Sequence, residues 1–147
     1  MSYNDLRKGR FSQINQEYFI TFNTKNRSPL FTDLNISQIT INEILNLESG
    51  SKWLAWVLMP DHFHGILLLK NSDLSKVIKN CKARSAIKIN KYLDRKGNVW
   101  QSGFYDRLIR REEDRVGIAR YIVANPLRAR LVKKISDYPY WDSVWLK

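Results

Sequence analysis

The chain of 147 residues contains one cysteine and two histidines, and this scarcity excludes several kinds of site. Cys81 has no second cysteine with which to form an internal disulfide, and a zinc cluster built from cysteines cannot form. Any metal site based on imidazole must use His62 and His64. The low cysteine content also fits a cytoplasmic protein, because thiols stay reduced in that compartment.

Long apolar runs and acidic residues are scarce as well. No apolar run reaches the roughly 20 residues that span a bilayer, and the polar start MSYNDLRKGR shows no signal peptide. We therefore expect a cytoplasmic protein without a membrane partner. Only 14 acidic residues oppose 25 lysines and arginines, which leaves a net charge of +11. This charge favours nucleic acid as the partner, although a merely solvated basic surface is the alternative.

The patterning of the remaining sequence predicts an α+β fold. Apolar alternation predicts strands over residues 17–24, 53–59, 62–70 and 99–109. Helical spacing predicts helices over residues 33–47, 72–93 and 112–125. This order fits a ferredoxin-like antiparallel sheet with helices on one face, plus an added helix free to lie near the histidine face. We expect a single domain over residues 1–147, with a basic arm at about 1–15 and an aromatic tail at about 135–147 that either packs on the domain or stacks on bases.

The two histidines share the motif His62-Phe63-His64 at the start of a predicted strand. Residues two apart on a strand point to the same face, so both imidazoles project together while Phe63 points into the core. Two imidazoles on one face can bind a divalent metal and leave positions for an oxygen ligand, water and substrate. The alternative is one exposed histidine and one hydrogen-bonded core histidine.

The predicted helix over 72–93 carries a basic face beside its apolar stripe. Leu74, Ile78, Cys81, Ser85, Ile89 and Tyr92 form the stripe that we expect to face the core. Arg84, Lys88, Lys91 and Arg95 recur at spacings of four, three and four, so they share a face that either contacts phosphates or is simply solvated.

On the last predicted helix, Tyr121 and Asn125 lie four residues apart and therefore on one face. A tyrosine can act as a nucleophile and an amide oxygen can bind a hard cation, whereas a packed aromatic is the simpler interpretation of Tyr121 alone. Pro126 disfavours helical geometry at Asn125, so we expect the helix to end or kink there.

Four blocks of the chain together resemble a known family. The runs MPDHFHGILLL and ARYIVANPLRARLV are similar to the histidine strand and the nucleophile helix of the HUH single-tyrosine transposases of small insertion sequences. The runs RKGRFSQINQEYFITFNTKNRSPLF and VWQSGFYDRLIRREED resemble, more narrowly, the REP-associated tyrosine transposases. The resemblance extends from about Arg7 to Trp145 and is loosest after Lys134.

The resemblance implies a strand transferase that cleaves and rejoins single-stranded DNA at or near hairpins through a 5′-phosphotyrosine. Tyr121 would be the nucleophile, and His62, His64 and Asn125 would bind Mg²⁺ or Mn²⁺. The protein would act as a monomer or a homodimer. A catalytically silent nucleic-acid-binding module and a metal nuclease that uses water are the alternatives. The candidate DNA contacts are basic residues: Arg7, Lys8, Arg10, Arg84, Lys88, Lys91, Arg95, Arg128 and Arg130.

Overall fold

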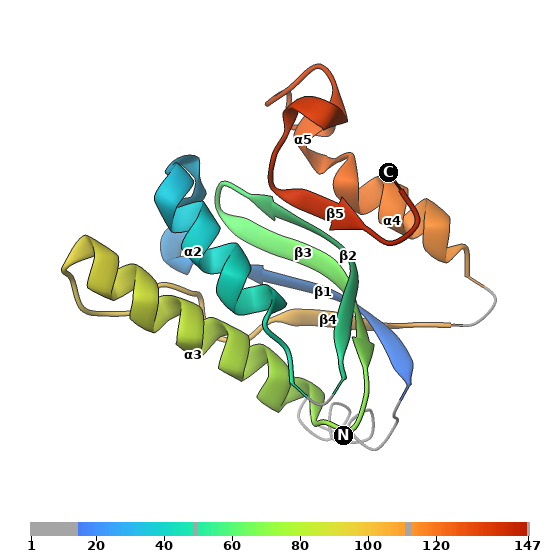
Figure 1. Ribbon diagram of the computed structural model, residues 1–147, viewed down its shortest axis with the longest axis horizontal. Coiled ribbons are helices and arrows are strands. Elements are labelled where there is room, and N and C mark those ends of the chain that lie inside the picture. Colours follow the sequence, from blue (N-terminus) through green and yellow to red (C-terminus); the bar gives the residue numbers. More distant parts are fainter. Residues whose placement is uncertain (1–14, 49, 111–112, 147) are drawn as a thin grey trace.

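A five-stranded antiparallel sheet forms the centre of the computed structural model, which describes residues 15–48, 50–110 and 113–146 (Figure 1). The strands are β1 (Gln16–Asn23), β2 (Lys52–Met59), β3 (His62–Leu69), β4 (Tyr105–Ile109) and β5 (Trp141–Ser143). Their order across the sheet is β4-β1-β3-β2-β5. The first four strands have the ferredoxin-like arrangement that the sequence predicts.

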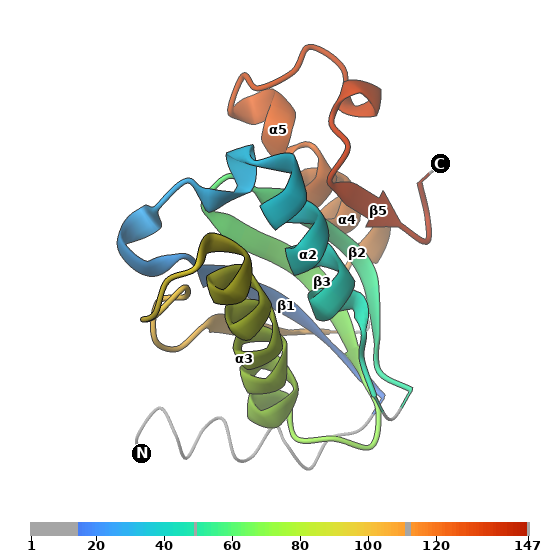
Figure 2. The same ribbon diagram turned by 60° about the vertical axis from the view of Figure 1, so that its left-hand side comes forward.

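One face of the sheet packs against α2 (Leu34–Leu45) and α3 (Leu74–Leu93), as Figures 1 and 2 show. Tyr18, Ile20 and Phe22 alternate along β1 and are buried in the core on this side. The intervening side chains of β1 point to the other face. Sheet and helices thus form the packed layers expected of an α+β domain.

Aspartates at the helix N-termini explain where α2 and α3 begin. Asp33 accepts a hydrogen bond from the Ile36 amide, and Asp73 accepts from the amides of Ser75 and Lys76. Such caps satisfy amides that have no partner within the helix. The predicted apolar stripe of α3 is buried from Leu74 to Ile89. The prediction was wrong at its last member, because the Tyr92 side chain is 48% exposed.

The opposite face of the sheet packs against α4 (Arg115–Val123), with α5 (Asn125–Arg128) following (Figure 1). Ala119 and Ile122 of α4 join Ile66 of β3 in a second apolar cluster, so α4 lies on the histidine face as predicted. The helix is interrupted at Ala124, which separates α4 from α5 one residue before Asn125. Pro126 lies in the first turn of α5, where its missing N–H costs no hydrogen bond.

The fourth strand is shorter than the predicted range 99–109 and begins at Tyr105. Trp100 makes only an isolated bridge to Thr24, and Gly103 has a positive φ of 79°. The Lys82 amine donates to the carbonyls of Gln101 and Gly103. The segment between Trp100 and Tyr105 is thus a loop that the Lys82 side chain ties to α3.

The aromatic tail packs on the domain, which confirms the first of the two predicted alternatives. Trp141–Ser143 pairs with β2 as the edge strand β5, which the sequence did not predict. The buried Tyr138 hydroxyl donates to the Leu58 carbonyl, and burial raises the pKa of Tyr138 well above its usual range.

Short 3-10 helices cover Lys25–Arg27, Leu30–Thr32 and Ile135–Asp137. Over the ranges that the structure describes, no helix has the length and apolar character of a membrane span.

Candidate active site

β3 presents both histidines on the face that α4 covers. The ring centroids of His62 and His64 are 6.4 Å apart. Phe63, between them, is fully buried on the other side and stacks on Phe22 at 5.2 Å. The alternation of the strand thus separates the chemistry-bearing side chains from the core, as the sequence predicts.

Each imidazole is oriented through its Nδ1 atom. His62 Nδ1 lies 2.8 Å from the Asp61 carboxylate, which also accepts from Arg27 Nε at 3.0 Å. His64 Nδ1 lies 2.6 Å from the Thr21 hydroxyl, on the residue opposite it in β1. A partner at Nδ1 that fixes the ring is typical of histidines that bind metal through the other nitrogen.

The remaining nitrogen of His64 is the most informative atom of the pair. His64 is 9% exposed, and its Nε2 atom is buried without a hydrogen-bond partner among the residues described. Burial, helped by the charges of His62 and Arg128, lowers the pKa of His64 to about 4. A buried polar atom without a partner is costly, and a neutral imidazole is the protonation state that binds metal.

The Asp61 carboxylate beside His62 is ionised. Burial raises the pKa of Asp61, but hydrogen bonds and charges from His62 and Arg27 outweigh this effect and hold the pKa below its usual value. Asp61 therefore supplies a fixed negative charge next to one histidine. The sequence did not predict Asp61 or Thr21 as site residues. The position of Asp61 directly before His62 is a local signal that could have found it, whereas Thr21 is 43 residues from His64 and only the strand register brings the two together.

Tyr121 lies on α4 with 59% of its side chain exposed. The guanidinium of Arg128, in the following helix α5, lies 3.8 Å from the centre of the tyrosine ring. The same charge is close enough to His64 to lower the pKa of its imidazole. Arg128 therefore contacts the tyrosine and acts electrostatically on the histidine, and Asn125, half-buried, begins the short helix that carries it.

A hollow of about 470 Å³ lies beside the tyrosine. Phe19 forms part of its wall and meets the edge of the His64 ring at a centroid distance of 4.4 Å. Open space thus borders Tyr121 on the face that carries the histidines. The full lining is Phe19, Arg107, Glu113, Asp114, Gly117, Ile118 and Tyr121.

Residues 12–125 match the family described as IS200-like transposases. The chain belongs to this family. A REP-associated tyrosine transposase of Escherichia coli strain K12 is 29% identical over 132 residues, which cover 84% of this chain and 73% of that protein. A solved structure of a REP-associated tyrosine transposase bound to a REP hairpin superposes with a TM-score of 0.73 at 26% identity, over 88% of this chain and 77% of that one.

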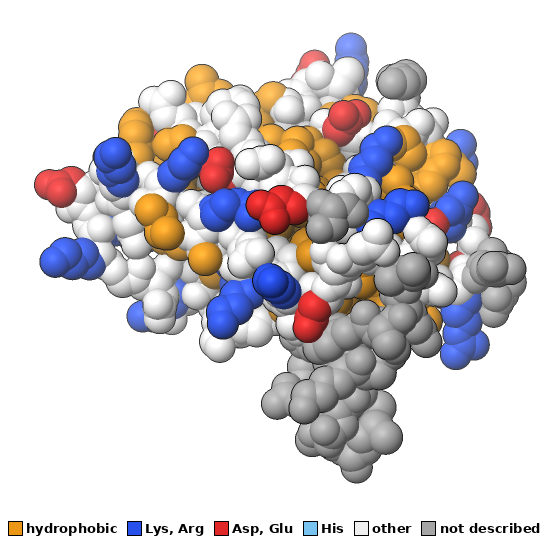
Figure 3. Space-filling model, turned by 60° about the horizontal axis from the view of Figure 1, so that its bottom comes forward, with side chains coloured by type: hydrophobic (Ala, Val, Ile, Leu, Met, Phe, Trp, Pro, Cys, Tyr) orange, Lys and Arg blue, Asp and Glu red, His pale blue; other side chains and the backbone are white. Residues whose placement is uncertain are grey.

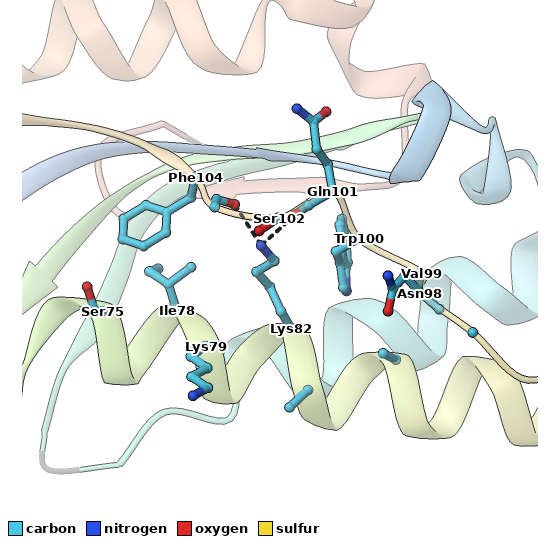
Figure 4. Close-up of a pocket in the computed structure, with 14 residues that line it drawn as sticks. Ser75, Ile78, Lys79, Lys82, Asn98, Val99, Trp100, Gln101, Ser102 and Phe104 are labelled. Carbon is cyan, nitrogen blue, oxygen red and sulfur yellow. Dashed lines mark hydrogen bonds between the residues drawn. The ribbon is translucent and has the colours of Figure 1, made fainter. Parts of the chain in front are cut away.

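The transposase has a second, larger hollow of about 540 Å³ between α3 and residues 97–104 (Figure 4). There the Lys82 amine points toward the loop and donates to the carbonyls of Gln101 at 2.8 Å and Gly103 at 2.6 Å. This hollow opens beside α3, whereas the histidines and Tyr121 lie on the α4 face. The larger of these two hollows is therefore separate from the candidate active site.

The predicted basic face of α3 divides into two parts. The Arg84 guanidinium donates to the carbonyls of Glu43 and Asn46 in and after α2, and Lys88 pairs with the Glu43 carboxylate at 3.2 Å. Both side chains thus tie α3 to α2, on the side of the sheet remote from the histidines. Lys91 is exposed further along the helix.

The other basic candidates of the transposase are spread over the molecule. Arg95 is exposed just beyond α3, Arg130 is exposed after α5 with a φ of 58°, and only Arg128 adjoins Tyr121 among the basic candidates described. On the face that Figure 3 shows, Lys and Arg side chains are interspersed with Asp and Glu instead of merging into one patch. Arg7, Lys8 and Arg10 lie outside the described residues.

Proposed function

We propose that this transposase cleaves and rejoins single-stranded DNA at or near hairpins, with Tyr121 as nucleophile and a divalent metal bound by His62, His64 and Asn125. The observation that carries the proposal is the shared face: α4 with its exposed tyrosine packs on the sheet face from which both imidazoles project. Phe19 contacts the His64 ring and also lines the hollow beside Tyr121. An exposed tyrosine under a guanidinium differs from the buried aromatic expected of a purely structural residue.

The donor set fits the metal that the family implies. His64 supplies a buried Nε2 atom without a partner in the described structure, and its lowered pKa keeps the imidazole neutral. Around the histidines, the described residues include no group of three or more His, Cys, Asp or Glu that could hold a metal. The Asn125 amide oxygen would add a hard ligand to two imidazoles, a combination suited to Mg²⁺ or Mn²⁺. When bound, the ion would polarise a non-bridging oxygen of the scissile phosphate.

Tyr121 performs the bond exchange. Its hydroxyl oxygen attacks the phosphorus and loses its proton to solvent, while the 3′ oxygen of the cleaved strand leaves and takes up a proton. The products are a 5′-phosphotyrosine and a free 3′-OH. A second 3′-OH reverses the same exchange, and this joins the strands without ATP because the phosphotyrosine retains the energy of the phosphodiester.

Arg128 and Asp61 each assist a different member of the site. The Arg128 guanidinium contacts the tyrosine ring, and it would bind an oxygen of the phosphate that Tyr121 attacks. Asp61 fixes the His62 ring and keeps a negative charge beside it. These interactions preorganise the side chains before DNA binds, which reduces the cost of reaching the reactive geometry.

Hairpin DNA is the substrate that we propose, because the similar solved structure is of a protein bound to a REP hairpin. The test is to incubate the protein with a pool of hairpin-bearing single strands and Mn²⁺, and then to recover and sequence the covalently attached DNA. We expect a protein–DNA adduct that EDTA prevents. Nicking without an adduct would indicate a nuclease that uses water, and binding without nicking would indicate a silent binding module.

A further inference from the structure

An aromatic wall that the proposed cleavage chemistry does not use lies at the hollow beside Tyr121: Phe19 lines the hollow, and Tyr105 contacts Phe19 next to it. Phe19 lies opposite Arg107, and Tyr105 lies opposite Thr21, in the pairing of β1 with β4. All four side chains therefore share the histidine face. The rings of Phe19 and Tyr105 meet edge to face at 6.3 Å, and Tyr105 is 56% exposed.

A fixed ion pair borders the same wall. Arg107 Nη1 lies 3.0 Å from both oxygens of the Glu113 carboxylate, and the guanidinium is 5.5 Å from the centre of the Phe19 ring. The Arg110 amide also donates to Glu113 at 3.1 Å. Hydrogen bonds from Arg110 and Arg107 hold the pKa of Glu113 below its usual value, so its carboxylate is ionised.

We propose that this hollow binds one nucleobase of the substrate strand beside Tyr121. The base would stack on the aromatic wall of Phe19 and Tyr105, and Arg107 and Glu113 would bind its polar edge. The inference rests on the proposed function for the identity of the substrate as single-stranded DNA. It goes further by assigning a base-binding site to residues outside the nucleophile and the metal ligands.

Charge favours a base over a phosphate in this space. Glu113 and Asp114 both line the hollow, and carboxylates repel a phosphodiester but accept hydrogen bonds from base amino groups. Arg107 supplies donors for a ring nitrogen or carbonyl of the same base. Aromatic rings in single-strand binding proteins provide stacking surfaces of this kind.

The same chemistry predicts a base preference. Adenine, cytosine and guanine carry an exocyclic amino group that can donate to Glu113, whereas thymine carries none. Thymine would also place a carbonyl oxygen on either side of its single ring N–H, next to the carboxylate. We therefore expect strands of amino-bearing bases to bind more tightly than thymine strands.

The test measures binding of fluorescein-labelled dA8, dC8 and dT8 by anisotropy in EDTA, so that it does not depend on cleavage. We expect wild-type protein to bind dA8 and dC8 more tightly than dT8. Tyr105→Ala should weaken dA8 and dC8 binding by about fivefold or more, the lower end for loss of one base–aromatic stack. Glu113→Gln should remove most of the preference over dT8.

Tyr92→Ala is the matched control, because Tyr92 is similarly exposed at 48% but lies on α3. It should leave the affinities and the preference unchanged. If Tyr105→Ala and Glu113→Gln bind all three strands as wild type does, the hollow does not bind a base. Adduct formation is measured separately with Mn²⁺. If wild-type protein forms no adduct, the result contradicts the proposed function and not this base-binding site.

Discussion

The Arg128 guanidinium lies over the ring of Tyr121, 3.8 Å from its centroid. This contact connects α5 to α4 on either side of Ala124, where the helix is interrupted. The same guanidinium acts electrostatically on His64 in β3. One side chain thus links the exposed tyrosine to the histidine face. This position distinguishes Arg128 from the rest of the 25 lysines and arginines of the chain.

Arg128→Ala should slow formation of the DNA adduct. Loss of the ring contact alone is worth about 0.5–1 kcal/mol, or roughly two- to fivefold, and loss of a charge at the reacting phosphate would extend the effect to about a hundredfold. Arg128→Lys should restore part of the rate, because it retains the charge but not the planar guanidinium. Single-turnover adduct formation on a saturating hairpin strand measures this effect. Equal rates for all three proteins would show that Arg128 has no role in adduct formation.

Metal dependence should follow the two histidines. His62→Ala and His64→Gln together should abolish cleavage but leave DNA affinity within a few-fold of wild type, since affinity comes mainly from phosphate contacts. Glutamine at 64 fills most of the buried space of the imidazole, so the fold should survive. Cleavage gels with Mn²⁺ or EDTA, beside anisotropy on the same strand, give both readouts. Wild-type cleavage by the double variant in EDTA would contradict a metal site at these residues.

Acid should destabilise the metal-free protein through His64. Its pKa in the folded protein is about 4, below the ordinary value of 6.5, so between these values the unfolded chain binds a proton that the folded protein does not. The free energy of unfolding therefore has its full value above about pH 6.5 and decreases by up to about 3 kcal/mol as the pH falls towards 4. Urea unfolding in EDTA at pH 7.5 and pH 5 should show a smaller pH effect in His64→Gln. An unchanged pH dependence in that variant would mean that another group is responsible.

Two residues of the predicted basic face should respond differently to alanine. Lys91→Ala should reduce the slope of log affinity against log salt by about 0.7 if it loses one phosphate contact, with little change in stability. Arg84→Ala should instead lower the free energy of unfolding by about 1–3 kcal/mol, because it removes two hydrogen bonds to α2 and leaves the buried Glu43 with fewer partners. Lys52→Ala, at the exposed start of β2, is the control for charge alone. A slope equal to that control would exclude Lys91 as a contact.

Strong local patterns predicted the strands β2 and β3, the capped helices and the placement of the histidines. Alternation fixes the face of a strand residue, and Asp33 and Asp73 mark helix starts by their chemistry. β5 escaped prediction because three residues carry little periodic signal and its pairing with β2 is a tertiary contact. The same limit applies to the start of β4, where Lys82 binds loop carbonyls from a distant helix.

The candidate site shows a similar division. The histidine motif and Tyr121 are visible as residue types at a spacing, but Thr21, Phe19 and Arg107 join the site only through the register of β1 with its neighbours. The spacing of Arg84 and Lys88 correctly placed them on one side of α3. It could not show that this side meets α2, because helical periodicity does not specify what a face contacts.

The identity of the nucleophile is the central claim, and peptide mass spectrometry of the trapped adduct tests it most directly. Tyr121 is exposed on α4 beside Arg128. Of the seven tyrosines, Tyr105 is the alternative nucleophile to exclude, because it is also exposed, on β4 beside Phe19. Protease and nuclease digestion should yield a nucleotide remnant on the peptide that contains Tyr121, and Tyr121→Phe should abolish the adduct while retaining fold and DNA binding. A remnant on Tyr105, or an adduct that persists in Tyr121→Phe, would contradict the account.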